Sequence, residues 1–109
     1  MTWNIEFLDE AKKDFKRLDH SVQAHVVRGI QKVAKNPVSM EKGGYGKPLG
    51  NKFGLNLTSL MKIKFRDLGI RVIYKVEVVG VVMKIIVISA RADEQVYQEA
   101  AKRKEKYGI

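Results

Sequence analysis

The stretch "MKIKFRDLGIRVIYKV", residues 61–76, decides the fold because apolar residues alternate with cations on both sides of a short turn. Such alternation is typical of β-strands with one buried face, and Asp67, Leu68 and Gly69 supply the turn between two strands. The interrupting cations are Lys62, Lys64, Arg66, Arg71 and Lys75. Because successive side chains of a strand point to opposite faces, we expect a basic sheet face, with Arg71 brought beside the lysines by antiparallel pairing.

The segments that follow extend this pattern to a third strand and a helix. "VVMKIIVIS", residues 81–89, is strongly apolar and follows a turn at residues 79–80, which predicts an antiparallel three-stranded meander over residues 60–89. "DEQVYQEAAKRKEKYG", residues 93–108, begins with Asp93 as a helix cap and predicts a short C-terminal helix. Apolar residues recur there at helical spacing at Val96, Tyr97, Ala100 and Ala101.

The segments that precede the meander predict a strand and two helices. "TWNIEF", residues 2–7, alternates apolar and polar residues and should form a strand. Apolar residues then recur at helical spacing through residues 8–18 and 22–34, with Asp9 and the side chains of residues 19–21 as caps, which indicates a two-helix hairpin. Helices packed across one face of the sheet would give an α+β domain.

Residues 36–56 contain five Gly and two Pro and predict a long, irregular, solvated loop. Pro37 should end the second helix of the hairpin. The one Gly-Lys pair of this stretch, Gly46-Lys47, is followed by Pro48 rather than by Ser or Thr. A phosphate-binding P-loop is therefore not expected.

Length and composition indicate one modest domain, and the net charge favours an anionic partner. The 109 residues fit one domain over residues 1–109, and the absence of Cys removes disulfides and thiolate metal sites. The amino terminus resembles no signal peptide, and no run of about 18 apolar residues predicts a membrane span, so we expect a cytoplasmic protein that binds no membrane. The formal net charge of +9 favours nucleic acid, the ribosome or an acidic protein as partner.

Clustered cations on one sheet face have two interpretations. A half-exposed antiparallel sheet normally has one polar face, and lysines there discourage edge pairing. However, like charges facing each other across a β-ladder destabilise it. Cations gathered opposite few carboxylates therefore indicate a site for an absent anion.

The order of the segments, with "KIKFRDLGIRVIYKV", "IIVISAR" and "VYQEAAKR" in the second half, resembles the RelE/ParE superfamily of bacterial toxins over nearly the whole chain. The resemblance is loosest over residues 36–56. It implies a RelE-like fold of the microbial ribonuclease type, without a cofactor. The RelE branch consists of ribosome-dependent endoribonucleases that cut messenger RNA in the A site, whereas the ParE branch inhibits DNA gyrase.

The resemblance carries a set of catalytic positions onto this chain. RelE-like enzymes rely on Lys-x-Lys in a strand, Gly-x-Arg in the next strand, an Arg after the last strand and a Tyr in the terminal helix. The matching residues are Lys62, Lys64, Arg71, Arg91 and Tyr97. Outside this set, we expect RNA or rRNA contacts at Arg66, Lys75, Lys102 and Arg103.

The residue types suit metal-independent cleavage by the RNA's own 2′-OH. Lys64 is the candidate base or proton shuttle, supported by the charge of Lys62, because neighbouring cations disfavour a charged lysine. Arg71 suits bidentate phosphate binding. Arg91 would stabilise developing charge, and Tyr97 would stack on a base or orient the 2′-OH.

Other interpretations of these groups stay open. Tyr97 also fits a packing aromatic, and Arg91 a surface ion pair with Asp93 or Glu94. His20 and His25 lie in the predicted helical hairpin, away from the basic face, and their spacing does not match a metal-binding helix face. The run "KRKEK", residues 102–106, is either a solvated helix face or an rRNA-binding supplement.

This chain departs from the family pattern at two places, which bear on the rate of cleavage, the codon preference and the rRNA contacts of the loop. Arg91 is flanked by Ala90, Ala92 and Asp93, where many relatives carry further basic residues, and Met61 stands where an aromatic residue is common.

The implied partners are a RelB-like antitoxin with an acidic binding segment, the ribosome, messenger RNA, and operator DNA through the antitoxin complex. Two alternative functions remain open at this point. One is a ParE-like inhibitor of DNA gyrase, and the other is a basic RNA-binding module that does not cleave.

Overall fold

The computed structural model describes residues 2–109. A five-stranded sheet in the order β1-β5-β4-β3-β2 forms its centre, with β1 parallel to β5 and the other neighbours antiparallel. The strands are β1 (Asn4–Phe7), β2 (Lys47–Lys52), β3 (Leu55–Phe65), β4 (Ile70–Glu77) and β5 (Val82–Ser89). The helices are α1 (Asp9–Lys16), α2 (His20–Val33), the 3-10 turn η1 (Met40–Lys42) and α3 (Asp93–Tyr107).

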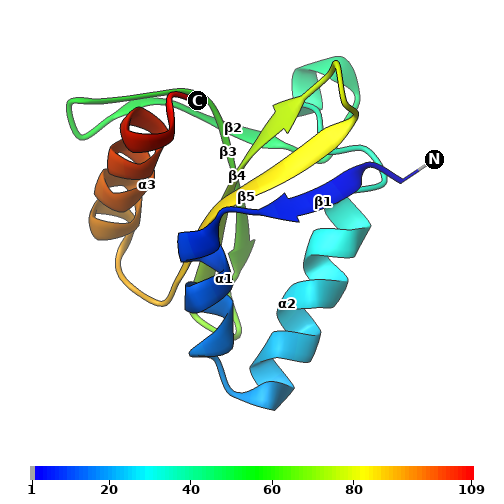
Figure 1. The fold of residues 1–109 in the computed structure, drawn as a ribbon, viewed down its shortest axis with the longest axis vertical. Coiled ribbons are helices and arrows are strands. Elements are labelled where there is room, and N and C mark those ends of the chain that lie inside the picture. Colours follow the sequence, from blue (N-terminus) through cyan, green and yellow to red (C-terminus); the bar gives the residue numbers. More distant parts are fainter. Residues whose placement is uncertain (1) are drawn as a thin grey trace.

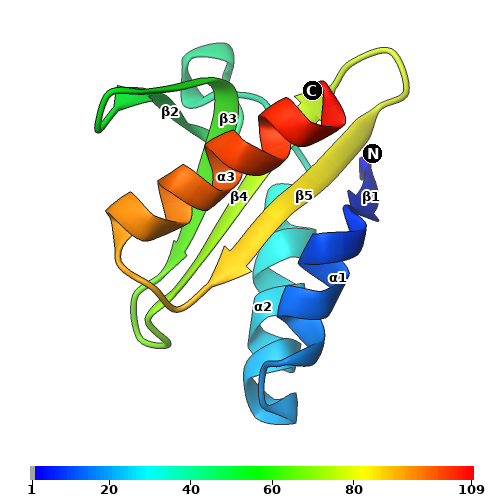
Figure 2. The ribbon, with the colours of Figure 1, turned by 60° about the vertical axis from the view of Figure 1, so that its left-hand side comes forward.

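Helices cover both faces of this sheet. Figure 1 shows α1 and α2 on one side and α3 on the other, and Figure 2 shows α3 lying across the strands. The α+β class and the order of elements are confirmed, whereas the packing of all helices across one face was wrong. The α3 helix has 15 residues and is not short.

The sheet is larger than the predicted meander because residues 36–56 do not form the solvated loop that their composition indicated. Residues 47–52 form β2, and β3 begins at Leu55 rather than at Leu60. Gly50 and Gly54 have φ angles of 63° and 72°, a left-handed conformation that a strand irregularity and a hairpin turn require. Leu49 and Leu57 place this hairpin in the core, since they are only 3% and 0% exposed.

The core lies on both sides of β4 and β5, where the largest fully buried side chains include Ile73, Tyr74, Ile85 and Ile86. The Tyr74 hydroxyl donates a hydrogen bond of 2.9 Å to the carbonyl oxygen of Pro37. Burial raises the pKa of Tyr74. This neutral phenol therefore holds the segment that follows α2 against the sheet.

The predicted caps differ in detail from the observed helix starts. Asp9 is the first residue of α1, with Leu8 as its N-cap, and Asp19 is the N-cap of α2 but makes no capping hydrogen bond through its side chain. Asp93 is the first residue of α3 rather than its cap. Within residues 2–109, no helix combines the length and apolar character needed to cross a membrane.

Candidate functional site

The β3–β4 hairpin places two of the predicted cations directly opposite each other. Lys64 pairs with Arg71 across the strands, and Gly69, with a φ angle of 65°, closes the turn between them. Side chains at paired positions share a face of the sheet. Lys62 lies two residues before Lys64 on this face, which is the face that α3 covers. The predicted basic face is therefore present at this end of the hairpin.

An acidic residue from α3 joins these cations. The Asp93 carboxylate accepts hydrogen bonds from Arg71 Nε and, at 3.3 Å, from Lys64 Nζ. Arg71 Nη1 also donates to the backbone carbonyl of Arg91 at 2.8 Å. Partial burial raises the pKa of Asp93, but the hydrogen bonds from Arg71 and Lys64 outweigh it and hold that pKa below its ordinary value. The sequence predicted a site for an external anion, and in this structure the Asp93 carboxylate of the chain itself partly fills that role.

Tyr97 lies one turn along α3 from Asp93 and is 1% exposed. Its hydroxyl accepts a hydrogen bond of 3.4 Å from Lys62 Nζ, and its ring contacts Phe53 at a centroid distance of 5.9 Å. Burial, followed by the charge of Asp93, raises the pKa of Tyr97, so the phenol is neutral. The predicted stacking of Tyr97 on a base is wrong for this structure, because its ring faces are covered.

Arg91 joins the cluster through its backbone alone. It is exposed beyond the end of β5, and its side chain lines an open groove of about 390 Å³ together with Gln95 and Glu99. Within residues 2–109 its guanidinium forms no ion pair or hydrogen bond, so the suggested pairing with Asp93 or Glu94 is wrong. The structure brings Lys62, Lys64, Arg71 and Tyr97 together and leaves the Arg91 side chain beside them.

The additional cations predicted for RNA contacts have separate positions. Arg66 is exposed and borders a shallow depression together with Lys64 and Arg71. Lys75 pairs with Leu60 and lies four residues from Arg71, about 13 Å at the usual rise of a strand. Lys102 is exposed on α3. Of these residues, Arg66 is the one that borders the cluster.

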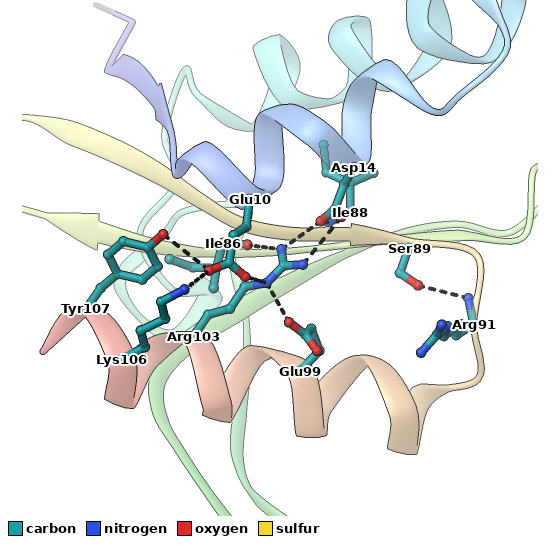
Figure 3. Close-up of polar contacts among 10 residues, drawn as sticks. All are labelled: Glu10, Asp14, Ile86, Ile88, Ser89, Arg91, Glu99, Arg103, Lys106 and Tyr107. Atoms are coloured by element: carbon teal, nitrogen blue, oxygen red, sulfur yellow. Dashed lines mark hydrogen bonds and ion pairs between the residues drawn. The ribbon is translucent and has the colours of Figure 1, made fainter.

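The prediction that Arg103 contacts RNA was wrong, because its side chain is buried within the protein. Figure 3 shows its guanidinium between α1, α3 and β5. It donates at 2.7 Å to Asp14, at 2.8 Å to Glu99 and at 2.8 Å to the carbonyl oxygen of Ile86. Glu10 lies 3.0 Å away. With 8% exposure and these partners, Arg103 connects the helices and is not available to RNA.

The histidines do not belong to this cluster. His20 and His25 lie on α2, which packs on the other face of the sheet, and Arg28 contacts the His25 ring at 3.3 Å. Within residues 2–109 no group of three or more His, Cys, Asp or Glu side chains is arranged to hold a metal ion.

Two residues of the site were not predicted as part of it. Asp93 was interpreted as a helix cap, although its sequence position, two residues after Arg91, placed it near the cations. Phe53 lies in the stretch interpreted as a loop, and only the β2–β3 pairing brings it to Tyr97.

Comparison with known proteins identifies the fold and similar proteins. No protein-family model matches the chain. A putative RelE-like toxin protein of Escherichia coli is 24% identical over 103 residues, which cover 94% of this chain and 98% of that protein. A mutant of the E. coli toxin RelE in the free state has a TM-score of 0.71 and 25% identity, and covers 94% of this chain and 98% of its own. An E. coli RelE mutant in complex with an antitoxin RelBc peptide has a TM-score of 0.66 and 26% identity, with the same coverage of 94% and 98%. In sequence and in fold, this chain is therefore similar to the RelE-like toxins.

Proposed function

We propose that this chain is the toxin of a type II toxin–antitoxin system and a ribosome-dependent endoribonuclease that cuts messenger RNA in the A site and so inhibits translation. One observation carries this proposal: Lys64 and Arg71, from neighbouring strands, already converge on one carboxylate. A phosphodiester presents two similar negatively charged oxygens, and a guanidinium is suited to bind them in a bidentate manner. The phosphate of the substrate takes the place of Asp93.

The reaction breaks one bond of the RNA and forms another within it. The 2′-oxygen loses its proton and attacks the neighbouring phosphorus, the bond from phosphorus to the 5′-oxygen breaks, and the 5′-oxygen gains a proton. The products are a 2′,3′-cyclic phosphate and a 5′-hydroxyl. DNA lacks the 2′-OH and is not cleaved.

Each residue of the cluster has a role in this reaction. Arg71 binds the phosphate, and Lys64 removes or relays the 2′-OH proton. Lys62 adds positive charge and is held in place by the Tyr97 hydroxyl, at 3.4 Å. Arg91 stabilises charge on the phosphorus centre after its side chain turns from the groove onto the bound RNA.

Dependence on the ribosome follows from the protein's own cluster. In the free chain, Arg71 and Lys64, which are proposed to bind the phosphate and to move the proton, both donate hydrogen bonds to Asp93. Ribosomal RNA would hold the messenger so that its phosphate displaces Asp93 from Lys64 and Arg71. Such orientation of a substrate is among the largest catalytic effects. Arg66, Lys75 and Lys102 are the proposed rRNA contacts, and the cytoplasm is the compartment of this activity.

The partner that neutralises the toxin is proposed to be a RelB-like antitoxin with an acidic segment. The solved RelE mutant bound to an antitoxin RelBc peptide supports this proposal, as does the charge of +9 on this chain. Operator DNA would be reached through the antitoxin complex.

The decisive experiment combines two assays on the purified chain. Programmed ribosomes with a defined message are incubated with the protein, and cut positions and end groups are mapped, while a gyrase supercoiling assay is run in parallel. Cuts at the A-site codon that leave cyclic-phosphate ends are the expected result. Inhibited supercoiling with an intact message would favour the ParE-like function, and ribosome binding without cuts would favour an RNA-binding module that does not cleave.

A further inference from the structure

The turn between β2 and β3 holds an aromatic residue in an unfavourable backbone conformation. Lys52 pairs with Leu55, so the turn consists of Phe53 and Gly54 alone. Their φ angles of 54° and 72° are both left-handed, as two-residue hairpin turns of the common type require. Asn or Gly is the usual first residue of such a turn, because a Cβ atom disfavours this conformation. A strained residue of this kind, kept at the edge of a proposed site, points to a function.

The Phe53 ring lies against the site and remains open to solvent. It packs on Tyr97 with an angle of 45° between the ring planes, and the β2–β3 hairpin projects from the sheet on the side of α3. Phe53 is 54% exposed, whereas Tyr97 is 1% exposed. Packing on Tyr97 therefore orients Phe53 without burying it. The aromatic surface that RNA can reach at this site belongs to Phe53.

Cations flank this ring on the strands that carry it. Lys52 precedes Phe53, and its charge acts on the Tyr97 hydroxyl. Lys47 pairs with Lys62 across β2 and β3, so both lie on the face that α3 covers. These lysines lead from the hairpin toward Lys64 and Arg71. An exposed aromatic ring bordered by a track of cations is the arrangement that binds single-stranded nucleic acid, with bases stacked and phosphates paired.

We propose that Phe53 stacks on a nucleobase of a single-stranded RNA whose phosphate is bound by Lys64 and Arg71. The inference rests on the proposed function for the identity of the nucleic acid and does not require cleavage. A nucleobase fits better than an apolar side chain of a peptide, because cations flank the ring and suit the phosphates on both sides of a base.

The test is a binding assay with short single-stranded RNA carrying 2′-O-methyl groups, which cannot be cleaved, and one 2-aminopurine base. Stacking on an aromatic side chain quenches 2-aminopurine fluorescence. Phe53→Leu should weaken binding by roughly ten-fold, as expected for one lost base stack, and should abolish the quenching. The salt dependence of the affinity should stay unchanged, because no cation is removed. Phe53→Trp should restore both the affinity and the quenching.

Controls separate stacking from loss of structure. Thermal unfolding of each variant checks the packing on Tyr97, and Tyr45→Leu removes another exposed aromatic, 51% exposed, from a separate loop. An RNA with an abasic residue at the 2-aminopurine position should bind equally to the wild-type chain and to Phe53→Leu. Equal binding of these two chains to the intact RNA, including no binding by either, would overturn the inference.

The remaining outcomes distinguish this inference from the proposed function. If a base stacks on Phe53 but the chain leaves programmed messages intact, the proposed nuclease function is wrong and the base-stacking role of Phe53 stands. If the chain cleaves messages at the A-site codon but Phe53→Leu binds RNA with unchanged affinity, the nuclease function stands and the base-stacking role is wrong. If Phe53→Leu weakens binding of an acidic helical peptide and leaves RNA binding unchanged, Phe53 is a peptide contact and the inference is overturned.

Discussion

Helix α3 takes part in two clusters of charge, one in its first turn and one in its C-terminal half, and the two differ in balance. Around Arg103, the carboxylates of Glu10, Asp14 and Glu99 lie within 3.0 Å of a guanidinium whose side chain is 9% exposed. Around Asp93, a single carboxylate binds Lys64 and Arg71, whose side chains are 32% and 25% exposed. One cluster is rich in anions and closed, and the other is rich in cations and open.

The two balances separate the cation that the fold needs from the cations that it leaves for a ligand. Burial alone lowers the pKa of Arg103, but Asp14 and Glu99 outweigh it and raise that pKa, so the charge is kept inside the protein. A buried ion that loses its partner is strongly destabilising. The site cations are partly solvated, and Asp93 offsets only part of their repulsion. Their excess charge is therefore available to an external anion.

The largest effect expected from this comparison is on stability. Arg103→Met removes the largely buried guanidinium and leaves the Asp14 carboxylate, 10% exposed, without its cation, so it should lower the free energy of unfolding by about 3–5 kcal/mol, measured by chemical denaturation. Arg28→Met, at an exposed position of α2, is the matched control and should change it by less than about 0.5 kcal/mol. A stable Arg103→Met variant with weakened RNA binding would reverse the roles of the two clusters.

The next effect is on catalysis. Arg71→Ala removes the proposed phosphate-binding guanidinium and should lower the rate of message cleavage on programmed ribosomes by about 100-fold. Its stability should fall by only about 1 kcal/mol or less, because its ion pair is partly exposed. Arg28→Ala removes the same charge from the other face and should cleave at the wild-type rate. Equal losses in the two variants would mean that net charge, and no particular site, drives the activity.

The sequence predicted the open cluster better than the closed one. Alternation placed Lys62 and Lys64 on one face, and antiparallel pairing across the short turn predicted Arg71 beside them, whereas the register that sets Arg71 opposite Lys64 comes from the structure. The Arg103 pairs join residues up to 93 positions apart, which no local pattern encodes. A signal was nevertheless present: Arg103 follows Val96 and Ala100 at helical spacing, which placed it on the apolar face of α3 although the run "KRKEK" is uniformly polar.

Most elements of the fold were also predictable from local apolar patterns, but β2 was not. Strands and helices with a clear apolar period were identified, whereas Gly and Pro concealed the strand at residues 47–52, where Gly50 serves a strand irregularity and Gly54 serves the turn that follows. Asp93 was assigned to a cap because carboxylates often occupy helix starts. Its preference for Arg71 and Lys64 depends on how α3 docks on the sheet, which is tertiary information.

A smaller effect is expected at the anion of the open cluster. Asp93→Asn removes the carboxylate that competes with phosphate, and should tighten binding of an uncleavable RNA by about ten-fold, equivalent to about 1.4 kcal/mol. Asp19→Asn is the matched control, since Asp19 is an exposed residue at the start of α2 with no capping bond. Unchanged RNA affinity combined with lost cleavage would instead make Asp93 a participant in proton transfer.

The same carboxylate predicts a dependence of stability on acid. Because the folded-state pKa of Asp93 lies below its unfolded value of about 3.9, its contribution is complete above that value and is lost as the pH falls through the folded pKa. The difference in unfolding free energy between the wild-type chain and Asp93→Asn should be constant from about pH 7 to 5 and shrink below about pH 4. A difference that persists at low pH would show that the ion pairs are not its source.

The smallest effect is expected at the partner of Lys62. Tyr97→Ala would open a cavity in the core and lower stability by roughly 3–5 kcal/mol, so Tyr97→Phe is the informative change. It removes one long hydrogen bond of 3.4 Å from Lys62 and keeps the ring under Phe53, so cleavage should fall by about three-fold and stability by about 1 kcal/mol or less. Tyr45→Phe serves as the control. In the open cluster Lys62 is thus held by a neutral phenol rather than by a carboxylate. If Tyr97→Phe slowed cleavage as much as Arg71→Ala, the hydroxyl itself would act on the RNA, and positioning of Lys62 would no longer describe its role.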